Sequence, residues 1–121
     1  MDEELRGELL AMRARDRKTR SQGFEIGGRY GSDAENVERV HRENALRLKE
    51  IVDQHGWPGT SLVGEDGCDA AWVIAQHAIS LPEIQKDFLR RVQEAVDRGD
   101  IDRRRYESFL RIRESLEAGE R

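Results

Sequence analysis

The feature that most constrains the fold is a stripe of apolar residues between residues 33 and 55. Its members recur every three or four positions, which places them on one face of a helix. They are Val37, Val40, Leu48, Ile51 and Val52. Gly56 and Pro58 follow and end the run, because neither residue favours the continuation of a helix. The stripe predicts a long helix that must bury this face against other helices.

A second stripe lies near the N-terminus. Residues 2–20 contain no proline, and their apolar side chains at helical spacing are Leu5, Leu9 and Met12. We therefore predict a helix over residues 2–20. Residues 21–34 follow and contain four glycines, all between positions 23 and 31. This glycine content predicts a loop over about 21–34.

Two more helices are predicted in the middle of the chain. Residues 70–79 are apolar nearly all the way round, which is typical of a helix at the centre of a fold, and Asp66 is its expected N-cap. The preceding residues 60–64 are expected to be briefly extended. Ser80-Leu81-Pro82-Glu83 then has the residues of a capping box, which predicts a fourth helix that ends near Gly99. Its apolar stripe is Ile84, Phe88, Val92 and Val96.

A fifth helix is predicted to begin after Asp100 or Asp102. Its apolar residues are Tyr106, Phe109, Leu110 and Leu116. The connections between the predicted helices are short, so neighbouring helices should pack antiparallel. The length of 121 residues fits one domain. We therefore expect a single all-α domain over residues 1–121, a compact bundle of about five helices.

Composition and charge narrow the class of protein. The 21 basic and 25 acidic residues are interleaved along the chain and give a net charge of -4, so we predict no nucleic-acid partner. No apolar run approaches the roughly 20 residues that cross a bilayer, and the N-terminus is acidic where a signal peptide would be basic. We expect a cytoplasmic protein without a membrane partner. Cys68 is the only cysteine, which excludes an internal disulfide. We expect a packed or surface thiol rather than a reactive one, because the neighbouring acids Asp66 and Asp69 disfavour a thiolate.

Candidate site residues are polar side chains at positions that the helical stripes assign to the interior. The stripe of the first helix continues to Asp16 and then to Thr19 or Arg20. His41 and Asn44 lie on the inner face of the second helix, and Gln76 and His77 interrupt the apolar third helix. An unpaired buried polar group costs about 1–3 kcal/mol. These residues should therefore contact one another or line a cavity.

Four short motifs carry a resemblance to a known family. They are His55-Gly56-Trp57-Pro58, Ser61-Leu62-Val63-Gly64, Ala70-Ala71-Trp72 and Gln76-His77-Ala78. In this order they resemble an uncharacterised bacterial domain family of unknown function. The resemblance implies a shared site that uses Asp16, Arg20, Asn44, His55, Trp57, Gln76 and His77. An aspartate usually stands in that family where this chain has His41, and a Tyr-Gly-Thr-Gln segment usually follows the last helix, where this chain has Gly119-Glu120-Arg121.

The three histidines also raise the question of a metal. His41 and His55 are fourteen positions apart on the predicted helix, which separates them by roughly 21 Å, so they cannot share one ion. His41 or His55 with His77 and an acid such as Asp16 remains open, but the chain has no HxxxH or HExxH spacing. We predict no metal ligands and no cofactor.

Two functions are consistent with these residues. The first is a cofactor-independent enzyme or small-molecule binder with a pocket between the first three helices. In its catalytic form His77 or His41 is a general acid or base, Asp16 orients it, and Arg20 with Asn44 or Gln76 holds an anionic or carbonyl group. His55 and Trp57 are the other expected ligand-binding residues, although His55 fits better as a residue that stabilises the end of its helix. The second function is a protein-interaction or regulatory module whose buried polar cluster is structural.

Overall fold

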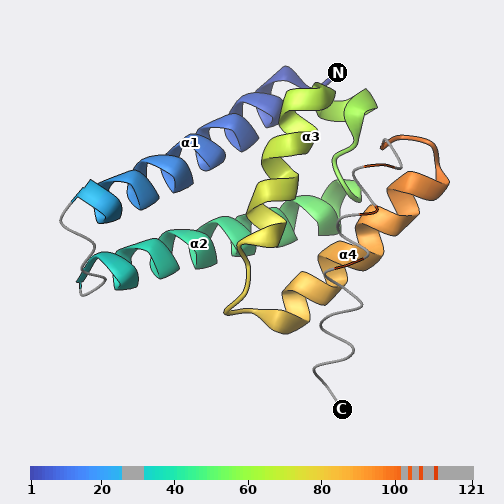
Figure 1. Cartoon of the computed structure of the whole chain (residues 1–121). Helices are drawn as coiled ribbons and strands as arrows, with labels where there is room; N and C mark the ends of the chain where they lie inside the picture. The colour runs from blue at the N-terminus through green and yellow to red at the C-terminus, as the bar shows by residue number, and fades with distance from the viewer. Residues whose placement is uncertain (26–31, 102–103, 105–106, 108–110, 112–121) are drawn as a thin grey trace, which may run out of the picture.

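The computed structural model describes residues 1–25, 32–101, 104, 107 and 111, with side chains from Met1 to Thr19 and from Glu35 onward. The described residues form four helices: α1 (Glu3–Glu25), α2 (Ser32–His55), α3 (Thr60–Gln76) and α4 (Pro82–Asp97). Figure 1 shows α1 and α2 running antiparallel, with α3 lying across them and α4 crossing near the end of α2. The all-α class is confirmed. None of the described helices is long and apolar enough to cross a membrane.

The first helix is longer than predicted. Asp2 caps it, since the backbone N–H of Leu5 donates to Oδ1 of Asp2 at 3.0 Å. The helix then continues to Glu25 instead of ending at residue 20, so the predicted loop over 21–34 is too long. A single glycine such as Gly23 costs about 1 kcal/mol in a helix, which weakens the helix without ending it.

The second helix agrees with its prediction. It begins at Ser32 and ends at His55, where Gly56 takes a positive φ of 77°. Glycine adopts this left-handed conformation without the steric penalty that a side chain brings. The apolar stripe therefore ends where the chain must turn.

The third helix begins earlier than predicted. Residues 60–63 are helical rather than extended, and Gly64, with φ 74° and ψ 173°, is a kink before the rest of the helix. The N-cap is Gly59 rather than Asp66, and glycine has no side chain that could cap the helix itself. The cap comes from Asp100: the backbone N–H and the hydroxyl of Ser61 each donate to its carboxylate at 2.9 Å.

The fourth helix begins at Pro82, but the predicted capping box is wrong. Leu81 is the N-cap, and no side chain caps the helix. Pro82 lies in the first turn, where its missing N–H costs nothing. The predicted fifth helix lies mostly outside the described residues, so the described part has four helices instead of about five.

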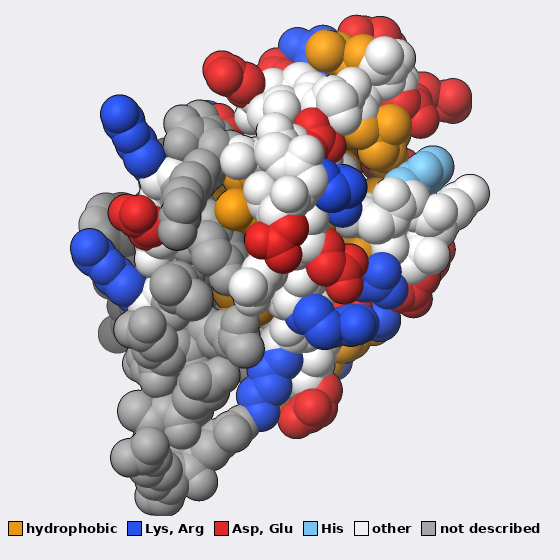
Figure 2. Space-filling model, turned by 90° about the vertical axis from the view of Figure 1, so that its right-hand side faces the viewer, with side chains coloured by type: hydrophobic (Ala, Val, Ile, Leu, Met, Phe, Trp, Pro, Cys, Tyr) orange, Lys and Arg blue, Asp and Glu red, His pale blue; other side chains and the backbone are white. Residues whose placement is uncertain are grey.

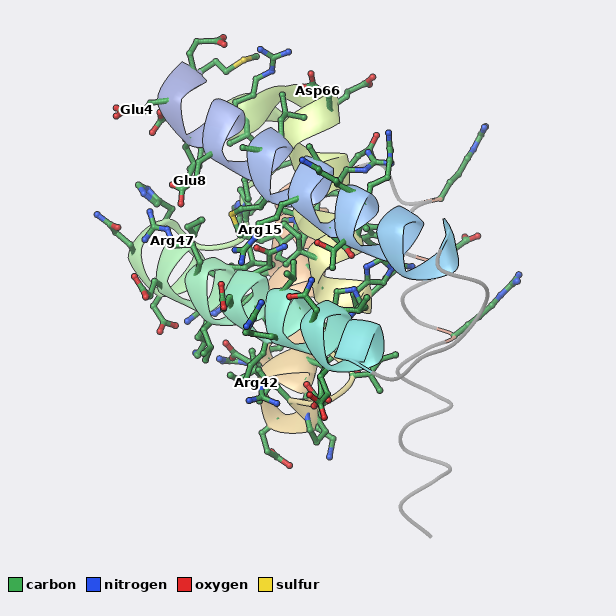
Figure 3. All side chains as sticks on the ribbon, turned by 90° about the vertical axis from the view of Figure 1, so that its left-hand side faces the viewer. Glu4, Glu8, Arg15, Arg42, Arg47 and Asp66 are labelled. Carbon is green, nitrogen blue, oxygen red and sulfur yellow. The ribbon has the colours of Figure 1, made fainter. Side chains whose placement is uncertain are left out.

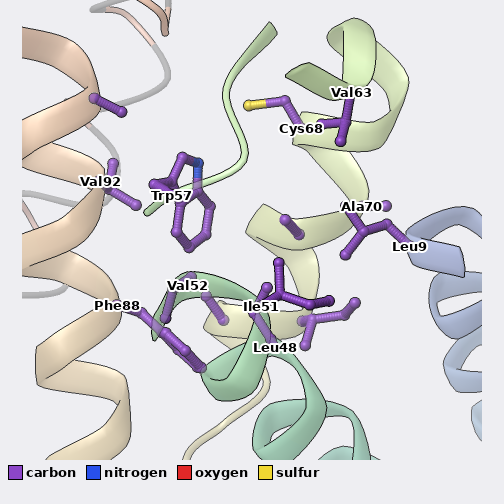
Figure 4. Packing of buried hydrophobic residues seen from close by; sticks show 14 of the residues in the cluster. Leu9, Leu48, Ile51, Val52, Trp57, Val63, Cys68, Ala70, Phe88 and Val92 are labelled. Carbon is purple, nitrogen blue, oxygen red and sulfur yellow. The ribbon is translucent and has the colours of Figure 1, made fainter. Parts of the chain in front are cut away.

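The core is one continuous apolar cluster between the helices. Trp57, Phe88, Leu48 and Ile51 are at most 1% exposed, and the rings of Trp57 and Phe88 meet edge to face with centroids 6.4 Å apart (Figure 4). Cys68 belongs to the same cluster and is buried, in line with a packed thiol. Full burial of one such side chain contributes about 1.5–3 kcal/mol, so this cluster is the main source of stability.

Charged side chains fix the register of α1 against α2. Arg47 of α2 donates to both carboxylate oxygens of Glu8 at 2.5 and 2.9 Å, and Arg15 lies 2.8 Å from Glu43 (Figure 3). The later residue of α1 pairs with the earlier residue of α2, as an antiparallel pair of helices requires. On the face shown in Figure 2, acidic and basic side chains are interspersed, as the sequence predicted.

Candidate functional site

Three of the predicted site residues meet where α1, α2 and the end of α3 come together. Asp16 comes from α1 and His41 from α2, and His77 is the residue that caps the C-terminus of α3. Oδ1 of Asp16 lies 2.8 Å from Nε2 of His41, and Oδ2 lies 2.5 Å from Nδ1 of His77. The two imidazole rings are 4.8 Å apart between centroids and tilted by 34°. One carboxylate therefore bridges two histidines.

The electrostatics of this cluster favour an ionised carboxylate. Burial of Asp16 opposes ionisation, but hydrogen bonds from His41 and His77 outweigh it and hold the pKa of Asp16 well below its usual range. An ionised carboxylate only accepts hydrogen bonds. His41 therefore donates from Nε2 and His77 from Nδ1, and in the neutral form of either ring the lone pair is on its other nitrogen.

The cluster has a buried side and an open side. The side chain of Asp16 is 3% exposed, whereas those of His41 and His77 are 18% and 22% exposed. The carboxylate thus lies at the base and the imidazole edges reach solvent. Solvent therefore reaches the two rings, while the charge that orients them stays sheltered.

A second buried polar residue holds α1 and α2 in place beside the cluster. The side-chain amide of Asn44 donates to the backbone carbonyl of Met12 at 3.1 Å and is buried. Met12 lies one turn before Asp16, and Asn44 lies one turn after His41. Asn44 was predicted to bind a ligand, and its amide nitrogen bonds α1 beside the cluster.

Gln85 of α4 holds the end of α3 in place in a similar way. It was not among the site residues predicted from the sequence. Its amide donates to the carbonyls of Ala75 and Gln76 at 3.1 and 3.2 Å, and the side chain is buried. These carbonyls belong to the last turn before His77, where a helix lacks its own donors. The signal was present in the sequence: Gln85 shares helical spacing with the buried Phe88, a polar residue on an apolar stripe.

The remaining predicted residues lie outside the cluster or at its edge. Gln76 is half-buried and contributes a backbone carbonyl to Gln85. Arg20 lies one turn beyond Asp16 on α1, but its side chain is outside the described ones. His55 is exposed in the last turn of α2, where the sequence placed it.

Trp57 takes a different position from the one predicted. It was expected to face a ligand, but its side chain is 1% exposed and packs against Phe88 in the core. A tryptophan buries one of the largest apolar surfaces of any residue, and here that surface faces α4. Trp57 is therefore removed from the set of candidate ligand-binding residues.

The cluster also brings together atoms that bind metals. One oxygen of Asp16 and one ring nitrogen each of His41 and His77 lie within 4.8 Å of one another. The sequence predicted no metal ligands because no two histidines have a metal-binding spacing on one helix. Three different helices supply these atoms instead.

Comparison with known proteins places the chain in a family. A family model described as a family of unknown function (DUF6624) matches residues 3–115. The chain belongs to this family. The match to DUF6624 spans α1 to α4, so the Asp16, His41 and His77 cluster lies within the shared domain. The resemblance to an uncharacterised family is confirmed. No curated protein and no solved structure matched the chain.

Proposed function

We propose that this chain is a small enzyme or small-molecule binding protein whose site is the cluster of Asp16, His41 and His77. The observation that carries the proposal is the 2.5 Å contact between Oδ2 of Asp16 and Nδ1 of His77. A buried carboxylate that accepts from one ring nitrogen orients the imidazole and selects its tautomer, so the other nitrogen can take a proton. His77 is the proposed general base.

His41 extends this arrangement. Its Nε2 donates to the second oxygen of the same carboxylate, so its Nδ1 holds the other lone pair. Two tilted imidazole rings with centroids 4.8 Å apart can act on one small substrate as base and acid. Arg20, one turn beyond Asp16, is the proposed partner for an anionic or carbonyl group of that substrate.

A specific observation favours a second candidate function. Both oxygens of Asp16 already accept hydrogen bonds from histidines, so the cluster is satisfied without a ligand. A network of this kind can fix the packing of three helices without any chemistry. The chain would then be an interaction or regulatory module that binds proteins through its charged outer faces.

A ligand screen by thermal unfolding separates the two. Wild type, His77→Gln and the exposed control His55→Gln are screened against a panel of metabolites in buffer that contains a chelator, because a ligand of the folded state raises its melting temperature. We expect a compound that stabilises wild type and His55→Gln but not His77→Gln. If no compound stabilises wild type while His77→Gln melts far lower, the structural network is the better interpretation.

A further inference from the structure

We infer that Asp16, His41 and His77 form a binding site for one divalent transition-metal ion of the Zn²⁺ class. The donors are of the right kind, since carboxylate oxygen and imidazole nitrogen are standard ligands of Zn²⁺ and related ions. Each donor comes from a different helix region, so the fold and not a local motif assembles the set.

The spacing of the donor atoms fits an ion after small movements. Ligand bonds of about 2.0–2.1 Å in a tetrahedral site place the ligand atoms about 3.3 Å from one another. The oxygens of Asp16 lie 2.8 Å from Nε2 of His41 and 2.5 Å from Nδ1 of His77, and all three donors lie within 4.8 Å. The two contacts to Asp16 therefore open by less than about 1 Å. The ion takes the place of the two bridging protons, and each neutral ring then carries its proton on its other nitrogen.

The charge of the cluster also favours a cation. The side chain of Asp16 is 3% exposed, so water screens the charge of its carboxylate poorly. The two histidine rings are the ligands, and they also contact each other. An ion bound by both rings and one carboxylate oxygen replaces the two hydrogen bonds that the carboxylate now accepts.

The number of ligands points to a catalytic rather than a structural type of site. Structural zinc sites have four protein ligands, whereas catalytic sites have three and leave one position to water or substrate. Here three ligands would surround the ion, and two of them, the rings of His41 and His77, are partly exposed to solvent. An open position would therefore face solvent.

Buried residues around the cluster give it the rigidity that a metal site needs. Asn44 fixes the turn of α1 before Asp16 through Met12, and Gln85 fixes the last turn of α3 before His77. Both residues bond the backbone next to the ligands, so they hold the helix turns that carry Asp16 and His77. They are positioning residues for the proposed ion.

The inference concerns the cluster of the proposed function but does not depend on the proposed metal-free catalysis. With an ion bound, the nitrogens that now face Asp16 become metal ligands, and a metal-bound water can provide the base. The screen above contains a chelator, so it tests the metal-free function. The experiment below measures metal binding alone.

The test is isothermal titration of ZnCl₂ into the chelator-treated full chain. We expect one ion per chain for wild type and for His55→Gln, which removes an exposed histidine outside the cluster. Binding should be weaker by more than about 100-fold in each of Asp16→Asn, His41→Gln and His77→Gln. This is more than the loss expected when a residue that only supports a metal ligand is removed. Circular dichroism and thermal unfolding show whether each variant is folded.

A second measurement on wild type avoids the dependence on variants. The ring signals of the three histidines are followed by NMR during the same titration. We expect the signals of His41 and His77 to shift together and those of His55 to stay in place. Absence of binding in wild type, or shifts only at His55, would overturn the inference and leave the chelator screen unaffected.

Discussion

Asp16 and His77 are 61 positions apart in the sequence, yet Oδ2 of the one lies 2.5 Å from Nδ1 of the other. The contact ties the first helix to the end of the third, and His41 of the second helix bonds the other carboxylate oxygen. The positions of the aspartate and of both histidines therefore depend on the same tertiary arrangement. Loss of one partner leaves a buried charge or ring without its bond, which is costly.

We expect strong coupling between Asp16 and His77 in a double-mutant cycle. Because the two side chains share a hydrogen bond, the effects of Asp16→Asn and His77→Gln on the free energy of unfolding should fall short of additivity by about 0.5–3 kcal/mol. Urea denaturation of the four proteins at neutral pH measures this. The pair Asp16→Asn and His55→Gln is the control, and it should be additive because His55 is exposed at the end of α2.

We expect Asn44→Ala to destabilise the protein by about 1–3 kcal/mol, because it removes a buried hydrogen bond between α2 and α1. Glu43→Ala removes the neighbouring but exposed pair with Arg15 and should cost less than about 1 kcal/mol. Denaturant unfolding gives both values. The histidine ring signals of His41 and His77 should shift in Asn44→Ala and remain in Glu43→Ala, and equal shifts in both would contradict a positioning role.

The cluster could be predicted from the sequence to the extent that its members interrupt apolar stripes. Asp16, His41 and His77 stand at positions that helical spacing assigns to the interior, and the need to satisfy buried polar groups predicts that they meet. The same reasoning did not separate Asn44 from them. Whether an inner amide faces a ligand or a neighbouring backbone carbonyl depends on the register of two helices, which spacing within one helix does not determine.

The N-terminal cap of α3 could not be predicted from the sequence alone. Asp66 was the natural N-cap by local rules, but the cap is the carboxylate of Asp100, 39 positions after Ser61. A local rule considers only the residues next to a helix, whereas this carboxylate arrives from the end of α4. The close approach also explains Gly59, where a Cβ would lie 2.2 Å from Oδ2 of Asp100 and 2.9 Å from its backbone oxygen.

We therefore predict that Gly59→Ala destabilises the protein by about 1–3 kcal/mol through this overlap. Asp100→Ala in the wild-type background removes the cap and should cost about 1 kcal/mol. In the Gly59→Ala background the same change should cost less, because the clash has already displaced the carboxylate. Gly7→Ala is the matched control, since a Cβ there meets nothing within 4 Å. Thermal unfolding of the five proteins measures these costs, and equal costs of Asp100→Ala in both backgrounds would rule out the overlap with the carboxylate.

Asp87 of α4 gives a prediction on pH. Lys49 of α2 lies 2.9 Å from one of its oxygens and Arg90 lies 2.5 Å from the other, and the side chain of Asp87 is 16% exposed. Burial opposes ionisation, but the hydrogen bonds from Arg90 and Lys49 outweigh it, so the pKa of Asp87 is lowered in the folded state. A lowered pKa stabilises the fold above the ordinary aspartate value of about 4, and this contribution disappears as pH falls below that value.

The variant Asp87→Asn should therefore cost up to about 1 kcal/mol at pH 7 and progressively less towards pH 3. The difference between wild type and variant isolates Asp87, because other carboxylates titrate alike in both proteins. Urea denaturation across this pH range measures the difference. Glu83→Gln is the control on the same helix, since the side chain of Glu83 is 89% exposed and its effect should stay within about 0.5 kcal/mol at every pH. A cost of Asp87→Asn that does not change with pH would contradict a lowered pKa of Asp87 in the folded state.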